Sequence, residues 1–102
     1  MADIVDRHRE QIVALCKRTG VRRLDVFGSA LRGDFDPLRS DVDLLVEFDE
    51  ATPAQYAQTY FALKEGLEAV LGRPVDLVTL AGLTNPFLRR RIDAERRILY
   101  AR

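Results

Sequence analysis

Two periodicities divide the chain into predicted helices and strands. Over residues 3 to 19, apolar positions recur every three to four residues, which predicts one amphipathic helix. Gly20 follows and is suited to the left-handed conformation that commonly ends a helix. Two short apolar runs, residues 22 to 27 and 41 to 48, predict strands, and the charged stretch between them reads as a loop with room for one helical turn after Ser29. The apolar stripe of the helix consists of Ile4, Val5, His8, Ile12, Val13, Leu15 and Cys16.

The second half of the chain continues the pattern with clearer start signals. Thr52-Pro53 is typical of a helix start, and an apolar stripe then continues to Leu71. Residues 75 to 79 predict a third strand. Asn85-Pro86 repeats the start signal for another helix, and residues 98 to 100 fit either a last helical turn or a short closing strand. The residues expected on the inner face of that helix are Phe87, Leu88 and Ile92.

The order of predicted elements is α-β-β-α-β-α, with the closing strand left open. This order predicts an α/β (α+β) fold in which a small sheet of three to four strands is backed by helices. With 102 residues, the chain is expected to form a single domain, residues 1 to 102, near the lower end of what builds an adequate core without disulfides.

Composition narrows the classes of partner. The formal net charge is zero, so no overall field attracts the chain to nucleic acid or to an anionic membrane. No apolar run is long enough to cross a bilayer, and we expect a cytoplasmic protein. Cys16 is the single cysteine, which excludes an internal disulfide and a multi-cysteine metal site.

Asp41-Val42-Asp43 opens the second predicted strand with two carboxylates. Side chains alternate between the faces of a strand, so Asp41 and Asp43 point the same way, with Cα atoms about 6.5–7 Å apart. Asp76, in the third strand, joins them if that strand pairs beside the second. Like charges so placed repel each other. A hard divalent cation with oxygen ligands, Mg²⁺ above all, would offset the repulsion; the alternative is a pair of solvated aspartates on an edge strand.

Gly28-Ser29 follows the first strand directly. Glycine lets the backbone approach a ligand closely, and the serine hydroxyl and the amides after it can donate to phosphate oxygens. A plain serine N-cap after a glycine bend would give the same dipeptide. Together with the three aspartates, the turn predicts two-metal phosphoryl or nucleotidyl transfer, with the cations about 3.5–4 Å apart.

Gly28-Ser29, Asp41-Val42-Asp43 and Asp76 resemble the Gly-Ser…Asp-x-Asp…Asp signature of the polymerase-β-like nucleotidyltransferase superfamily. The segment GSALRGDFDPLRSDVDLLVEF is most similar to its smallest members, the minimal nucleotidyltransferases (MNT), and the likeness covers most of the chain. Residues 30 to 40 place one residue more between Ser29 and Asp41 than the family motif usually has.

The resemblance implies a mixed sheet with helices packed on one side and an Mg²⁺–ATP site at its edge. By position, Asp41 and Asp43 would hold the metal ions, of which the chemistry calls for two. Asp76 would hold the catalytic metal and help to deprotonate the attacking hydroxyl. Gly28 and Ser29 would bind the β- and γ-phosphates of ATP.

Family members of this size are often encoded beside a HEPN-domain toxin, a helical ribonuclease, and some neutralise it by transferring AMP to a tyrosine near its active site. The resemblance therefore implies a protein adenylyltransferase that acts as the antitoxin of a HEPN/MNT toxin–antitoxin pair. Two alternatives stay open. One is a binding module that blocks its partner by occupancy. The other is nucleotidyl transfer to RNA or a small molecule, which the zero net charge and the lack of an acceptor domain disfavour.

Further candidate residues lie in the loop and at the C-terminal end. Arg32 and Arg39 are candidates for reaching a triphosphate. In residues 83 to 102, six arginines outnumber two acids, which fits a solvated helix face or a contact with a partner or RNA. The six arginines are Arg89, Arg90, Arg91, Arg96, Arg97 and Arg102.

The exposed edges of so small a sheet would favour pairing with a second copy or with a partner.

Overall fold

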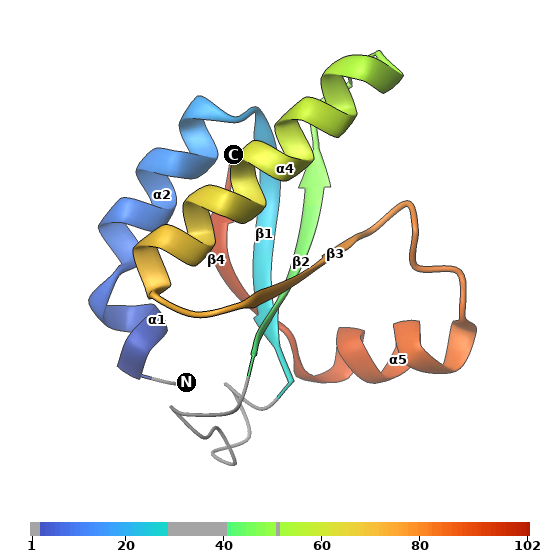
Figure 1. The fold of residues 1–102 in the computed structure, drawn as a ribbon. Helices are drawn as coiled ribbons and strands as arrows, with labels where there is room; N and C mark the ends of the chain where they lie inside the picture. The colour runs from blue at the N-terminus through green and yellow to red at the C-terminus, as the bar shows by residue number, and fades with distance from the viewer. Residues whose placement is uncertain (1–2, 29–40, 51) are drawn as a thin grey trace.

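A computed structural model describes residues 3–28, 41–50 and 52–102 of the chain. Its centre is a four-stranded sheet in the order β3-β2-β1-β4 (Figure 1). The strands are β1 (Val21–Phe27), β2 (Val42–Phe48), β3 (Val75–Thr79) and β4 (Arg97–Ala101). β1 runs antiparallel to both β2 and β4, whereas β3 is parallel to β2. The sheet is therefore mixed, as the resemblance implied, and residues 98 to 100 belong to a closing strand.

Helices cover one face of this sheet. In Figure 1, α2 and α4 lie side by side against the sheet, whereas α5 lies apart, near one end of the strands. The helices are α1 (Asp3–Arg7), α2 (Arg9–Arg18), α4 (Pro53–Leu71) and α5 (Pro86–Glu95). Within the described residues, no helix combines the length and the apolar character that crossing a membrane requires.

The first predicted helix is interrupted at His8. The sequence predicted one helix over residues 3 to 19, but His8 has φ −111° and ψ 15°, which ends α1 before α2 begins. The imidazole Nδ1 of His8 donates to the Ile4 carbonyl oxygen at 2.8 Å, and the backbone N–H of His8 donates to Val5 instead, at 3.2 Å. The side chain thus takes the acceptor that an uninterrupted helix would give to its own backbone.

The two predicted helix starts are confirmed. The Thr52 hydroxyl accepts from the Gln55 N–H at 3.2 Å, and the Gln55 side chain accepts from the Thr52 N–H at 3.1 Å, which completes a capping box. The Asn85 side chain accepts from the N–H groups of Phe87 and Leu88, at 2.9 and 3.2 Å. Each cap satisfies amides that the first helical turn leaves without a partner.

Each face of the sheet carries its own apolar cluster. The larger one lies between the sheet and the helices α1, α2 and α4, and includes Leu24, Leu44 and Leu77. Because strand residues alternate between faces, Phe27, which follows the buried Val26, and Leu45, which follows Leu44, point to the opposite face. There they pack with one residue of α5, Ile92.

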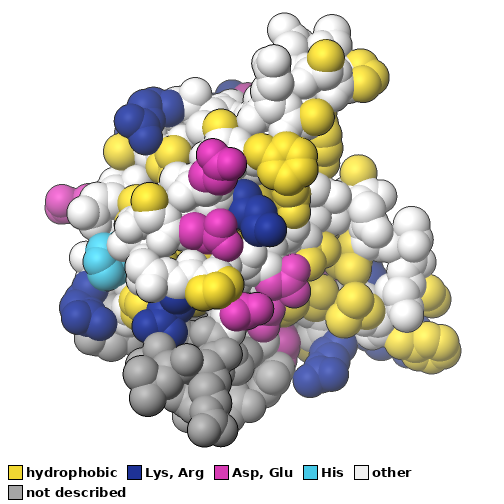
Figure 2. Space-filling model, viewed as in Figure 1, with side chains coloured by type: hydrophobic (Ala, Val, Ile, Leu, Met, Phe, Trp, Pro, Cys, Tyr) yellow, Lys and Arg dark blue, Asp and Glu magenta, His cyan; other side chains and the backbone are white. Residues whose placement is uncertain are grey.

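The expectation that Phe87 and Leu88 face the core together with Ile92 is wrong. Phe87 is 77% exposed and Leu88 42%, whereas Ile92 is 1% exposed. Space filling shows hydrophobic side chains uncovered over α5 (Figure 2). A single buried residue therefore anchors α5 by packing, and the remaining restraints on this helix are polar.

Two tyrosines of α4 contact the sheet. Tyr60 donates its hydroxyl to the Leu77 carbonyl oxygen at 2.7 Å, and Tyr56 meets Phe48 edge-on with ring centroids 5.2 Å apart. Together they join α4 to β2 and β3.

Cys16 is fully buried in the larger cluster, and burial raises the pKa of its thiol from 9.0 to about 12. A thiol with that pKa holds almost no thiolate near pH 8, and the thiolate is the reactive form. We expect alkylation of the native protein at pH 8 to be at least about 100-fold slower than alkylation in denaturant. Mass spectrometry of timed iodoacetamide reactions measures both rates. Equal rates would contradict the burial of this side chain.

Candidate functional site

Asp43 and Asp76 are direct neighbours on two parallel strands. The register of β2 against β3 pairs Asp43 with Asp76, between Val42 paired with Val75 and Leu44 paired with Leu77. Adjacent strands lie about 4.8 Å apart, and paired residues of a parallel ladder face the same side. Since Val42 and Leu44 point into the helix-covered core, both carboxylates point to the opposite face. The sequence predicted that Asp76 would lie beside Asp43 if the third strand paired with the second, and the structure shows this pairing.

Asp41 lies at the edge of this pair. The predicted strand 41 to 48 begins one residue later, at Val42, so Asp41 is an exposed residue just before β2. In Figure 2, acidic side chains lie close together toward the lower centre of the view, near where Figure 1 shows the start of β2. Among the described residues, however, no three His, Cys, Asp or Glu side chains converge to hold one metal ion.

Gly28 ends β1 directly against Asp43. Phe27 pairs with Asp43 in the β1–β2 register, and Gly28 follows with φ +75°. A Cβ at Gly28 would lie 2.2 Å from Oδ2 of Asp43, closer than any real contact. Only glycine therefore fits this turn while the Asp43 carboxylate keeps its place, both for its backbone angle and for its space.

The backbone N–H of Gly28 already has an acceptor. It donates to Oε1 of Glu95, at the end of α5, at 3.1 Å. Ser29, the second residue of the predicted phosphate-binding turn, lies outside the described residues, as do Arg32, Arg39 and the helical turn expected after Ser29.

Sequence reasoning missed Glu95 and the ion pairs of the C-terminal arginines. Glu95 was counted only as one acid among the six arginines, and its contact with Gly28 spans 67 residues of sequence. Arg96 lies 3.3 Å from the buried Asp25, and Arg89 lies 3.0 Å from Asp93. Arg102 pairs with Asp49. Part of the arginine excess is therefore used within the fold. The one available signal was Asp25 itself, a charge inside an apolar strand.

The donor chemistry fits magnesium and a nucleotide. The three aspartates offer only oxygen ligands, which Mg²⁺ prefers, and Mg²⁺ takes one or two carboxylates together with waters and substrate phosphates rather than a protein cage. The lack of a three-residue cage among the described residues is compatible with that mode of binding. Because Gly28 has no Cβ, the Asp43 carboxylate can occupy the space beside the turn.

A glycine turn packed on paired carboxylates, at one end of a small mixed sheet, is the arrangement of a nucleotidyltransferase. Comparison with known proteins agrees: the nucleotidyltransferase domain family matches residues 8–100. The chain therefore belongs to this family, and it is a nucleotidyltransferase enzyme.

Three similar proteins illustrate the relationship. Protein adenylyltransferase MntA of Thermococcus cleftensis is 41% identical over 80 residues, which cover 78% of this chain and 74% of that protein. A solved structure described as a candidate minimal nucleotidyltransferase is 39% identical, covers 95% of both chains and has a TM-score of 0.74. A toxin–antitoxin structure with AMP-PNP is 22% identical, with a TM-score of 0.67 over 92% of this chain and 73% of that chain, and shows likeness of fold.

Gly28→Ala tests the packing of the turn on Asp43. We expect it to lower the free energy of unfolding by more than Gly20→Ala does. Gly20 has φ +66° but open space around its Cβ position, so alanine there meets only the backbone penalty of about 1–2 kcal/mol. The clash at Gly28 should add about 1–3 kcal/mol. Urea denaturation of both variants measures the difference.

The double variant Gly28→Ala/Asp43→Ala serves as the control. Removing the carboxylate should recover most of the extra loss, because only the Asp43 Cβ would remain near the new methyl group. Equal losses for Gly28→Ala and Gly20→Ala would contradict the close contact.

Proposed function

We propose that this nucleotidyltransferase transfers AMP from ATP, with Mg²⁺, to a hydroxyl of a partner protein. The acceptor would be a tyrosine of a HEPN-type ribonuclease toxin encoded beside it, and the modification would neutralise the toxin. The observation that carries the proposal is the pairing of Asp43 with Asp76 beside the Gly28 turn. The enzyme would work in the cytoplasm, where it would meet ATP and the toxin together.

The aspartates divide the work in this proposal. Asp41 and Asp43 would hold two Mg²⁺ ions, with Asp76 also a ligand of the catalytic ion. When bound, Mg²⁺ neutralises triphosphate charge and favours ionisation of the attacking hydroxyl. Gly28 shapes the turn so that the Ser29 hydroxyl and the amides after it can donate to the β- and γ-phosphates.

The proposed reaction is one displacement at the α-phosphorus of ATP. The acceptor oxygen forms a bond to that phosphorus, and the bond to the oxygen bridging the α- and β-phosphates breaks. Pyrophosphate leaves with the electron pair of the broken bond. The proton of the attacking hydroxyl passes to the carboxylate of Asp76, which is exposed and therefore accessible to an incoming group.

Two observations support a protein as the acceptor. The relative from Thermococcus cleftensis carries the name protein adenylyltransferase, and the structure with AMP-PNP is a toxin–antitoxin assembly. The described part of the chain consists of one sheet and its helices, so the acceptor would be recognised by docking of the partner. β3 and β4 are the edge strands of this sheet, where a partner or a second copy could add to it.

Asp41→Asn and Asp43→Asn are each expected to abolish AMP transfer while leaving the fold intact or slightly more stable. Each change removes a carboxylate charge from a cation site and relieves repulsion in the apo protein. Intact-mass analysis of the neighbouring gene's product, after incubation with this protein, ATP and Mg²⁺, measures transfer as a gain of AMP units.

Asp6→Asn, a change at an exposed position of α1, is the matched control and should transfer AMP like the wild type. Undiminished transfer by either site variant would refute the proposed roles. A stable complex without any gain of mass in the wild type would instead favour neutralisation by occupancy.

Asp76→Asn is expected to reduce turnover more than nucleotide binding, because its main proposed role is at the attacking hydroxyl. Turnover should fall by about 100-fold or more, the usual size of a general-base contribution, whereas the dissociation constant of ATP should change only a few-fold. Single-turnover mass analysis and ATP titration measure the two quantities. Equal losses in both would count against the role as proton acceptor.

A further inference from the structure

The turn that ends β1 is held by a residue from the other end of the chain. The Gly28 N–H, which is buried, donates to Oε1 of Glu95 at 3.1 Å. Directly beside it, the Asp43 carboxylate occupies the space that a side chain at Gly28 would need. Glu95 therefore acts on the backbone that packs against Asp43, from a distance of 67 residues in sequence.

Glu95 is fixed on both sides along the chain. Three residues earlier, Ile92 is 1% exposed and packs with Phe27 and Leu45 on the sheet. One residue later, Arg96 ends α5 by donating its N–H to the Ile92 carbonyl oxygen at 2.8 Å. The Glu95 backbone thus has little freedom where α5 passes into β4.

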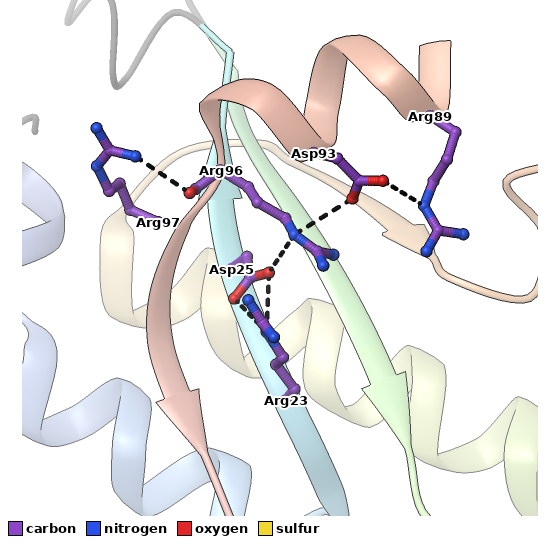
Figure 3. Close-up of polar contacts among 6 residues, drawn as sticks. All are labelled: Arg23, Asp25, Arg89, Asp93, Arg96 and Arg97. Carbon is purple, nitrogen blue, oxygen red and sulfur yellow. Dashed lines mark hydrogen bonds and ion pairs between the residues drawn. The ribbon is translucent and has the colours of Figure 1, made fainter. Parts of the chain in front are cut away.

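The side chain of Arg96 adds an ionic anchor, which Figure 3 shows in close-up. Its Nε lies 3.3 Å from Asp25 Oδ2, and Asp25 is 1% exposed in the middle of β1. Arg23 donates its Nε to both oxygens of the same carboxylate, at 3.0 and 3.1 Å. Arg96 also lies 3.4 Å from Asp93. Moving Arg96 away would leave the buried Asp25 carboxylate with one cationic partner fewer, which is unfavourable. The ion pair therefore holds Arg96 against β1.

We propose that Glu95 is a positioning residue of the nucleotide site, which holds the Gly28 turn against Asp43, and that the Arg96–Asp25 ion pair keeps Glu95 in place. This inference rests on the proposed function only for its kinetic consequence. The role needs a hydrogen-bond acceptor at Glu95 and does not need its charge. A glutamine retains that acceptor, whereas an alanine does not.

The kinetic test compares Glu95→Ala, Glu95→Gln and wild type in AMP transfer to the neighbouring gene's product. In Glu95→Ala, KM for ATP should rise about tenfold, as expected for one lost hydrogen bond, with kcat within about threefold of wild type. Glu95→Gln should restore both parameters to within about threefold. Glu65→Ala, an exposed acid on α4, is the matched control and should leave both unchanged.

A second measurement needs no activity. Hydrogen exchange of the Gly28 amide, followed by NMR, should be slow in wild type and Glu95→Gln and at least about tenfold faster in Glu95→Ala. Arg96→Gln should accelerate the same amide and raise KM for ATP in the same direction. A folded Arg96→Gln variant that changes neither would overturn the anchoring role of the ion pair.

The outcomes separate this inference from the proposed function. Equal defects in Glu95→Ala and Glu95→Gln would overturn the inference, because charge rather than hydrogen-bond acceptance would then be required. Wild-type kinetics and Gly28 exchange in Glu95→Ala would overturn it as well. If the wild type transfers no AMP, the proposed function fails, and the exchange rates of the Gly28 amide still decide the role of Glu95.

Discussion

The register of β2 against β3 is the constraint on which the site depends. One face of both strands is buried under the helices, where Val42, Leu44 and Val46 pack beside Val75 and Leu77. A slip of one residue would turn these side chains to the other face, at a cost of several buried apolar groups. The same register forces Asp43 and Asp76 into direct opposition. Hydrophobic packing on one face thus holds two like charges together on the other.

The repulsion between Asp43 and Asp76 lowers the stability of the domain by less than the buried apolar side chains raise it. Like-charged cross-strand pairs cost a fraction of 1 kcal/mol to about 1 kcal/mol, whereas a single buried leucine or valine contributes about 1.5–3 kcal/mol. The arrangement is therefore stable without a cation, and the proposed Mg²⁺ would offset the repulsion when bound. The apolar burial on one face of the sheet thus outweighs the repulsion between the two aspartates on the other face.

On the sheet face opposite α1, α2 and α4, the helix α5 is attached mainly by polar contacts. Ile92 gives this helix one buried apolar contact, and the ion pairs around Asp25 supply the other fixed point. Removing one partner of a buried pair costs about 3–5 kcal/mol in the general case, although Arg23 and Arg96 share Asp25, so either arginine alone contributes less. Directional contacts of this kind orient a helix end more strictly than a small apolar patch does. The consequence is a defined place for Glu95.

Much of the fold could be predicted from the chain because its signals are local. Strand periods, caps such as Thr52 and Asn85, and positive-φ glycines each depend on a few neighbouring residues. The predictions that were wrong, at His8 and at Phe87, concern contacts that these local patterns do not specify. At His8 the imidazole, rather than the backbone N–H of the same residue, donates to the Ile4 carbonyl oxygen. Phe87 follows the helical period, but no other described element packs over it, and it is exposed.

The candidate site was predictable in its residue types but not in its pairing. Asp43 and Asp76 meet only because β3 lies parallel beside β2, a pairing between segments far apart in the sequence. The contact of Glu95 with Gly28 depends in turn on where α5 ends, which no local pattern specifies. Long-range contacts of this kind follow from the assembled core rather than from any segment of it.

The three aspartates differ in how far they are exposed. Asp43 is half-buried, between the Gly28 turn and the paired strand, whereas Asp41 and Asp76 are exposed at either side of it. An exposed carboxylate can be reached from outside by an incoming group, as the role proposed for Asp76 in proton transfer requires. α1, α2 and α4 cover the other face of the sheet, so the proposed acceptor would approach on the side where Asp76 is exposed. Helix packing on one face of the sheet thus limits the directions from which an acceptor could reach the proposed site.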